Sequence, residues 1–141
     1  MSDPELVVEA SPTPAEIQYL EDRLYEFNAA ATGITDGESL AIFVRDVNRR
    51  IVAGIAGNTW GRCLEIRQLW VESSQRKQRL GTKLLAAAEQ EARRRGCEQV
   101  LLMTFAFQAP AFYAKHGFEV IASVDDHPLG HANLLLRKRF V

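Results

Sequence analysis

The stretch from Gln68 to Leu85 reads QLWVESSQRKQRLGTKLL and joins an apolar strand, a polar loop and the first turns of a helix. In such a unit the loop and the first helical turn leave backbone N–H groups unpaired, with the positive end of the helix dipole behind them. Gly81 lets the backbone approach an anion closely. Four basic side chains add positive charge: Arg76, Lys77, Arg79 and Lys83. The stretch therefore predicts a site for a phosphate or diphosphate group.

Two familiar nucleotide-binding motifs do not account for this stretch. A P-loop requires GxxxxGK[ST], whereas Gly81 is the only glycine here and Lys83 follows Thr82. The GxGxxG pattern of dinucleotide-binding folds is also absent. The predicted anion site is therefore neither of these two.

Helices and strands alternate on both sides of this unit. The apolar spacing of Ile17, Leu20 and Leu24 predicts a helix over 14–30, with Thr13 as its N-cap. The other predicted elements are helices over 80–95 and 109–116 and strands over 39–46, 51–60, 63–71, 99–104, 118–124 and 131–139. The short run at 6–8 predicts either a first strand or an ordered entry segment.

The order of these elements decides the fold class. The three strands between 39 and 71 follow one another through short turns and predict an antiparallel meander. The apolar run at 99–104 predicts a strand buried on both faces. Together they predict an α/β (α+β) fold with one mixed central sheet of about six to seven strands, flanked by about three to four helices.

The composition fits one soluble globular domain. The 141 residues are 47% hydrophobic and 25% charged, with a formal net charge of -1. That balance argues against a nucleic-acid binder, which usually has a strongly basic face. Residues 1–10 lack the pattern of a signal peptide, and no apolar run approaches the roughly 20 residues of a membrane-spanning helix. Because Cys63 and Cys97 are too few for a disulfide framework, we expect a cytoplasmic protein with reduced thiols and no membrane partner.

Two segments resemble one family. RKQRLG at Arg76–Gly81 resembles the acetyl-CoA loop of the GNAT superfamily of N-acetyltransferases, whose pattern is Q/R-x-x-G-x-G/A. The segment Phe105–Val120 resembles the family segment that ends in FY-x-x-x-GF, and the order of predicted elements matches the family over essentially the whole chain. The resemblance implies a single domain over 1–141 that transfers the acetyl group of acetyl-CoA directly to a primary amine of a small molecule or peptide. The alternative is a non-catalytic acyl-CoA sensor or interaction module on the same fold.

Arg79 stands where the family pattern has glycine. If that position needs a positive φ, arginine imposes strain or crowds the ligand. Alternatively, its side chain points outward and contacts a CoA phosphate. We expect the substitution to be tolerated.

The resemblance also implies which residues bind the cofactor. The backbone of Leu69 and Val71 is expected beside the pantetheine arm and the acetyl carbonyl. Gln108 takes the place of a family asparagine that contacts the same arm, with a loop-closing glutamine as the equal alternative. The predicted cofactor-binding set is Leu69, Val71, Arg76, Gln78, Arg79, Leu80, Gly81, Thr82, Lys83 and Gln108.

Tyr113 is the predicted catalytic acid. The resemblance places it where a tyrosine hydroxyl protonates the departing thiolate. A tyrosine beside Phe112 also suits the core, with only its hydroxyl in water.

Glu65 is the predicted catalytic base, because some family members carry a glutamate on this strand. Strand alternation puts Glu65 on the same face as Arg67, Leu69 and Val71. An exposed pair with Arg67 explains Glu65 equally well. Glu72 and a water relay remain the other candidates for the base.

Phe107, Asp125 and Asp126 are the predicted acceptor-binding residues, and the two acids favour a polyamine or another cationic amine. The cluster of these acids with His127 and His131 matches no common metal site, so we expect no metal. A homodimer through the early helix or the C-terminal strands is compatible with the sequence, which does not require one.

Overall fold

The computed structural model describes residues 3–140, apart from the side chain of Lys77. The chain divides after Thr35 into two compact units. No helix among the described residues is long and apolar enough to cross a membrane.

The first unit contains helix α1 (Pro14–Thr32), as the apolar spacing predicted. The Thr13 side chain accepts from the Glu16 amide, the Glu16 carboxylate accepts from the Thr13 amide, and Pro14 opens the helix. Gly33 ends it in the left-handed region at a φ of 74°. Of the two predictions for residues 6–8, the first strand is wrong: these residues are exposed and pair with no described strand.

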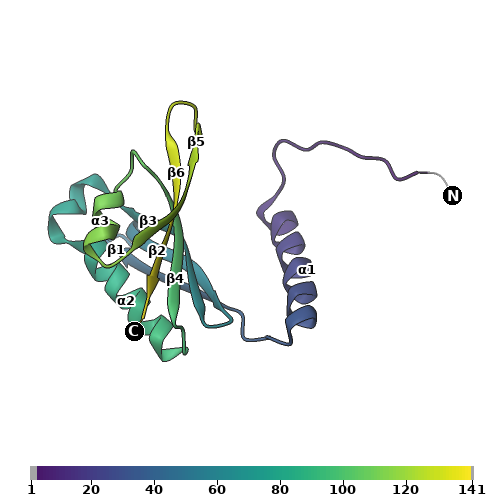
Figure 1. Ribbon diagram of the computed structural model, residues 1–141. Coiled ribbons are helices and arrows are strands. Elements are labelled where there is room, and N and C mark those ends of the chain that lie inside the picture. The colour runs from purple at the N-terminus through teal and green to yellow at the C-terminus, as the bar shows by residue number, and fades with distance from the viewer. Residues whose placement is uncertain (1–2, 141) are drawn as a thin grey trace. The chain divides into compact units, whose positions relative to one another are not determined.

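The second unit is built on one six-stranded sheet with the order β1-β2-β3-β4-β6-β5 (Figure 1). Its strands are β1 (Glu38–Arg45), β2 (Ile51–Trp60), β3 (Cys63–Val71), β4 (Gln99–Phe105), β5 (Glu119–Asp125) and β6 (Ala132–Arg139). Its helices are the 3₁₀ helix η1 (Ser73–Gln78), α2 (Leu80–Arg94) and α3 (Pro110–Lys115). The mixed fold class and the meander of β1, β2 and β3 are confirmed.

The core lies between α2 and the sheet (Figure 1). Leu84, Leu85, Ala88 and Ala92 recur on one face of α2 and are buried against the strands. The prediction that the strand at 99–104 is buried on both faces is wrong. Side chains of β4 alternate, with Leu102 buried and Met103 57% exposed, because the core covers one face of the strand.

A β-bulge in β3 decides which side chains face the core. Ile66 pairs with Gly57 of β2 while Gln68 pairs with the neighbouring Ala56, so Arg67 is an extra residue. The strands come so close here that a Cβ on Gly57 would lie 1.9 Å from the Glu65 carbonyl oxygen. Glycine at 57 is therefore what permits the bulge.

The bulge also corrects the predicted grouping of Glu65 with Leu69 and Val71. One extra residue shifts the alternation, so Leu69 and Val71 share the face of Ile66, and Glu65 lies on the other face. The side chains of Leu69 and Val71 accordingly pack against the core.

Candidate active site

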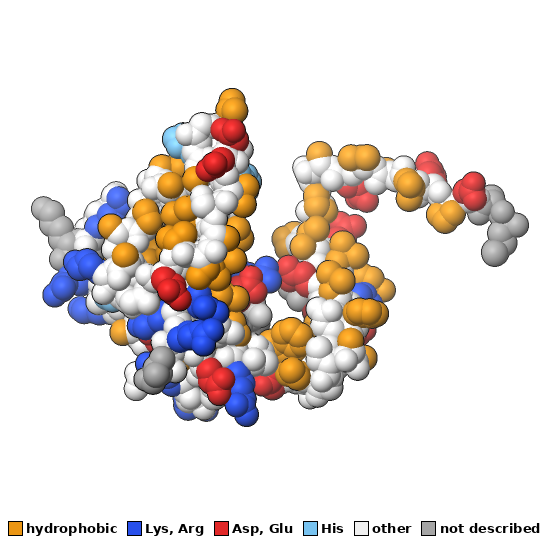
Figure 2. All heavy atoms as spheres, in the orientation of Figure 1, with side chains coloured by type: hydrophobic (Ala, Val, Ile, Leu, Met, Phe, Trp, Pro, Cys, Tyr) orange, Lys and Arg blue, Asp and Glu red, His pale blue; other side chains and the backbone are white. Residues whose placement is uncertain are grey.

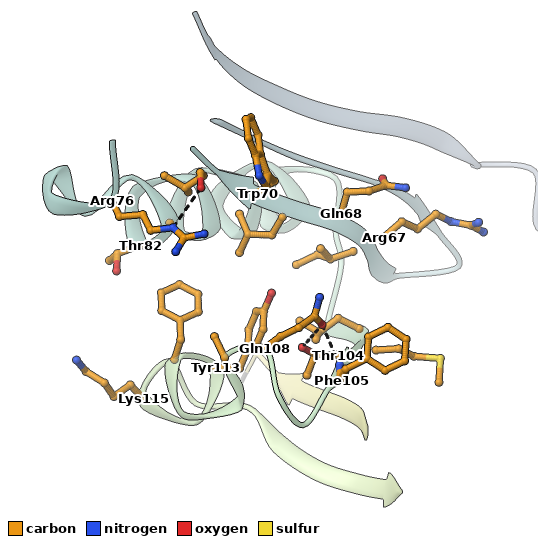
Figure 3. A pocket seen from close by; sticks show the side chains of 18 of the residues that line it. Arg67, Gln68, Trp70, Arg76, Thr82, Thr104, Phe105, Gln108, Tyr113 and Lys115 are labelled. Carbon is orange, nitrogen blue, oxygen red and sulfur yellow. Dashed lines mark hydrogen bonds between the residues drawn. The ribbon is translucent and has the colours of Figure 1, made fainter. Parts of the chain in front are cut away.

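A cavity of about 740 Å³ lies between β3, the end of β4, the start of α2 and helix α3 (Figure 3). Strands β3 and β4 pair in parallel only from Cys63 to Ile66, opposite Gln99 to Leu102. Beyond that point each strand continues without pairing to the other, and the cavity lies in this opening. Its lining residues are Ile66, Arg67, Gln68, Leu69, Trp70, Val71, Arg76, Arg79, Gly81, Thr82, Leu102, Met103, Thr104, Phe105, Gln108, Ala109, Phe112, Tyr113 and Lys115.

The backbone of β3 presents polar groups to this opening. Val71 lies opposite Ala53, and the Glu72 amide donates to the Val52 carbonyl at 2.8 Å. In an antiparallel ladder that bond makes Val71 and Ala53 a non-hydrogen-bonded pair, so the Val71 N–H and C=O point away from β2. The same alternation turns the N–H and C=O of Leu69 in that direction. A donor and an acceptor at Leu69 and a donor at Val71 therefore face the cavity.

One end of the cavity is suited to an anion. Arg76 and Lys115 line it, and the Arg76 Nε donates to the Val71 carbonyl oxygen at 3.4 Å (Figure 3). No described side chain caps the start of α2, so its first N–H groups remain for a ligand. Gly81 and Thr82 of that first turn also line the cavity. The predicted site for a phosphate or diphosphate group is thus present as an uncapped helix end with basic side chains around it.

Arg79 has a φ of 56° and a ψ of 33°, in the left-handed region, at the junction between η1 and α2. This is the position where the family pattern has glycine, and the backbone conformation is one that glycine adopts without cost. Arginine carries the strain of that conformation and still lines the cavity.

Tyr113 is buried on α3, with its ring edge-on to Phe112 and Phe118 at centroid distances of 5.2 and 5.6 Å. Its hydroxyl points into the cavity toward β3, and no described residue hydrogen-bonds it (Figure 3). Burial raises the pKa of this phenol, which keeps it protonated. Tyr113 is therefore a core aromatic that presents a proton donor to the cavity.

Gln108 closes the loop that follows β4. Its Oε1 accepts from the Thr104 hydroxyl and from the Phe105 amide, each at 2.9 Å. These two bonds fix the side-chain amide and leave the Nε2 group facing the cavity (Figure 3). Loop closure and a donor toward the cavity are thus combined in one side chain.

The candidates for the base lie outside the lining. Glu65 is half exposed and its Oε1 lies 3.9 Å from Nη2 of Arg67. Glu72 pairs with Arg50 at 2.7 Å, and this hydrogen bond lowers the pKa of Glu72. Among the described lining residues there is no Asp, Glu or His. A carboxylate can act on a group inside the cavity only through an intervening water.

Several other predicted site residues also lie outside the lining. Leu80 packs against the core, Lys83 is exposed, and Gln78 bonds to Gln75. Phe107, Asp125 and Asp126 lie in the loop after β4 and at the end of β5. The Asp126 Oδ1 accepts from the Gly130 amide at 3.2 Å. No group of three His, Cys, Asp or Glu side chains among the described residues could hold a metal ion.

Sequence reasoning missed four polar contributors to the lining: Arg67, Gln68, Thr104 and Lys115. Lys115 is within the FYAKHGF segment, three residues before Phe118, and its charge was an available signal. Gln68 directly follows the bulge, which turns it to the face opposite Leu69. Nothing in the local pattern identifies that bulge.

Comparison with known proteins identifies the family. Residues 5–118 match the Acetyltransferase (GNAT) family. Acetyltransferase Atu2258 of Agrobacterium fabrum is 34% identical over 121 residues, which cover 86% of this chain and 88% of the relative. A crystal structure of a protein assigned as an acetyltransferase, from Agrobacterium tumefaciens, matches with a TM-score of 0.84 and 31% identity, covering 97% of this chain and 100% of that one. An aminoglycoside 6'-N-acetyltransferase solved with coenzyme A shares the fold, at a TM-score of 0.64 and 18% identity over 93% of this chain and 96% of its own. The chain belongs to the GNAT acetyltransferase family.

Proposed function

We propose that this protein is an N-acetyltransferase that moves the acetyl group of acetyl-CoA directly to a primary amine. The observation that carries the proposal is the opening between β3 and β4, where free backbone groups, a cationic helix end and a buried tyrosine meet. Acetyl-CoA is the cosubstrate that goes with this family. It supplies an activated thioester whose thiol is the leaving group.

The residues present fit this cosubstrate. A diphosphate suits the uncapped start of α2 with Arg76 and Lys115 beside it. The pantetheine arm of acetyl-CoA is extended and carries amide groups. Such an amide can pair with the free N–H and C=O of Leu69 through two hydrogen bonds, as a neighbouring strand would. The Nε2 of Gln108 adds a donor from the opposite wall.

Each remaining step is assigned to a group of this chain. The Val71 N–H donates to the acetyl oxygen as negative charge develops there. A bond forms between the amine nitrogen and the acetyl carbon while the C–S bond breaks. Tyr113 gives its proton to the departing sulfur, and the proton lost by the amine restores the phenol through solvent.

The amine must lose a proton, because an alkylamine resembles lysine with a pKa near ~10.4. The lining carries Arg67, Arg76, Arg79 and Lys115 and, among its described residues, no carboxylate. Positive charge disfavours the protonated amine and so favours the neutral nucleophile. We assign proton removal to water, with Glu65, whose Oε1 lies 3.9 Å from Nη2 of the lining residue Arg67, as the carboxylate that relays the proton to solvent.

A non-catalytic acyl-CoA sensor on the same fold is the competing function. Tyr113 favours catalysis, because a sensor has no need of a proton donor with a raised pKa that faces the cavity. The same folded domain and the same cosubstrate affinity are expected of both, so only transfer distinguishes them.

The test is a thiol-release assay with acetyl-CoA and polyamines, aminoglycosides, amino acids and N-terminal peptides, with products identified by mass spectrometry. The proposal expects release that depends on one amine class and exceeds hydrolysis. Tight calorimetric binding of acetyl-CoA with no amine-dependent release would support the sensor instead. Cationic amines are the first class to test, because Asp125 and Asp126 are the predicted acceptor-binding acids. A homodimer is tested separately, by sedimentation.

A further inference from the structure

Four aromatic rings form a continuous row that leads out of the cavity. Phe105 lines the cavity and stacks on Phe107, with centroids 5.3 Å apart and ring planes 3° from parallel. The His127 ring lies edge-on to Phe105 at 5.5 Å, and the His131 ring lies edge-on to Phe107 at 5.0 Å. We call His127, Phe105, Phe107 and His131 the aromatic row.

Backbone hydrogen bonds hold the two loops that carry the row. The Ala106 amide donates to the Ala132 carbonyl at 2.8 Å, which ties the loop after β4 to the start of β6. The His127 amide donates to the His131 carbonyl at 3.0 Å, which closes the turn between β5 and β6. The rings are thus arranged before any ligand arrives, and a preorganised surface binds with a smaller entropy cost.

The row is open to solvent beside the cavity. Phe107 is 56% exposed, and Phe105 is partly exposed. Figure 2 shows His side chains beside hydrophobic ones near the tip of the β5–β6 hairpin. An exposed stack of two phenylalanines contributes little to folding, and grouped exposed apolar side chains at a cavity mark a binding surface.

The charges that line the cavity indicate how an acceptor amine is not held there. Four cations line it and no described lining residue is acidic, so a protonated amine gains no ion pair within it. The row offers ring faces and ring edges instead. Such faces attract flat aromatic groups through offset or edge-to-face contacts, which add to the gain from burial.

Resting on the proposed function, we propose that the aromatic row is an acceptor-binding subsite for primary amines that carry a flat aromatic ring. The ring of the acceptor stacks beside Phe107, and its amine arm extends past Phe105 into the cavity. The row then selects the acceptor while β3 and α2 hold the cosubstrate.

The test compares 2-phenylethylamine with 2-cyclohexylethylamine, which have the same arm and similar apolar size, but only the first has a flat ring. The wild type is expected to favour 2-phenylethylamine about threefold to tenfold in kcat/KM. Phe107→Leu keeps an apolar side chain and is expected to remove that preference. Leu129→Ala is the control, because Leu129 is 87% exposed in the turn that carries His127 and His131 and lies outside the row.

A second readout needs no turnover. Saturation-transfer NMR should detect the ring of 2-phenylethylamine on the wild type and on Leu129→Ala, and a much weaker signal on Phe107→Leu. Equal kcat/KM for the two amines, or a preference retained in Phe107→Leu, would overturn the subsite. Ring binding that depends on Phe107, with no acetylation of any amine tested, would reject the proposed function and leave the row as an aromatic-binding site that is not an acceptor site. Acetylation without ring preference would reject the subsite and support the proposed function.

Discussion

Arg79 occupies a backbone conformation that an L-residue adopts at a cost. Arg79 is the residue between η1 and α2, with a φ of 56°. This backbone turn orients the first N–H groups of α2 toward the cavity. The side chain is exposed and lines the cavity, so it fills no core space. The strain at this residue is therefore local, and glycine should release it.

Arg79→Gly is expected to raise the free energy of unfolding by up to about 1 kcal/mol. The left-handed conformation costs a non-glycine residue roughly 1–2 kcal/mol, and the greater freedom of glycine in the unfolded chain returns part of that. Urea unfolding measures the change, and calorimetry should show acetyl-CoA binding intact or improved. Arg79→Ala is the control, since it removes the guanidinium but keeps the positive φ, and it should not gain this stability. A large loss of affinity in both variants would show instead that the guanidinium contacts the cosubstrate.

Tyr113→Phe is expected to lower kcat by about 10²-fold or more, with little change in the KM for acetyl-CoA. Phenylalanine preserves the ring contacts with Phe112 and Phe118 and removes only the hydroxyl. Because burial raises the pKa of this phenol, Tyr113 stays protonated to a higher pH than an ordinary tyrosine does. Activity should fall only as the pH rises through that raised pKa. Tyr113→Phe should lack this alkaline fall. An unchanged kcat and pH profile would exclude Tyr113 as the acid.

Strand β3 is the element that brings the site together. Its first half pairs with β4 and closes the sheet, its bulge at Arg67 changes the alternation, and its second half leaves backbone groups free beside the cavity. The bulge depends on Gly57 in the neighbouring strand, where β2 and β3 approach most closely. One glycine on β2 thus sets the geometry of β3.

Gly57→Ala is expected to destabilise the protein by about 3 kcal/mol or more, because its Cβ would meet backbone rather than a movable side chain. Gly54→Ala in the same strand is the matched control. Its Cβ would lie 3.0 Å from the exposed Phe43 ring, which can shift, and 3.3 Å from the Ile42 carbonyl oxygen, so a cost of about 1 kcal/mol is expected. Urea unfolding compares the two, and equal costs would contradict the role of Gly57.

Local patterns predicted the elements well and their faces less well. The bounds of β3 and the cap of α1 at Thr13 follow from short-range rules, and the structure confirms both. The predicted face of Glu65 was wrong, because the bulge at Arg67 shifts the alternation of β3. That bulge depends on how closely the neighbouring strand approaches, which the sequence of β3 does not contain. The position of Lys115 in the cavity lining was also missed, because it depends on how α3 packs in the folded protein. For the candidate site, the sequence predicted the segment around Gly81, and the family resemblance implied a role for the backbone of Leu69 and Val71. Only the strand register shows that the Val71 N–H points away from β2.

Across the whole molecule the charges nearly cancel, with 17 basic and 18 acidic side chains, yet they are unevenly placed. Cations gather at the cavity, and no described acidic side chain lines it. The net charge of -1 thus conceals a local positive field, which attracts an anionic ligand and is screened by salt.

Raising NaCl from low salt to about 0.5 M should weaken acetyl-CoA binding severalfold, because the screening length shortens toward a few ångströms. S-acetylpantetheine is the matched ligand, since it keeps the arm and the thioester but lacks the phosphates. Its affinity should change little over the same range. Calorimetry of both ligands measures the effect, and equal salt dependence would contradict an electrostatic site at the start of α2.

The most direct test of the cavity as the acetyl-CoA site is an amide NMR titration with acetyl-CoA. Leu69 and Val71 should show large shifts of their N–H signals together with Gly81 and Thr82, because these groups line the opening and the start of α2. Amides of β1, which lies two strands away from the opening, serve as the internal control. Saturable shifts confined to the first group are the predicted result; saturable shifts that leave Leu69 and Val71 unmoved would contradict the account.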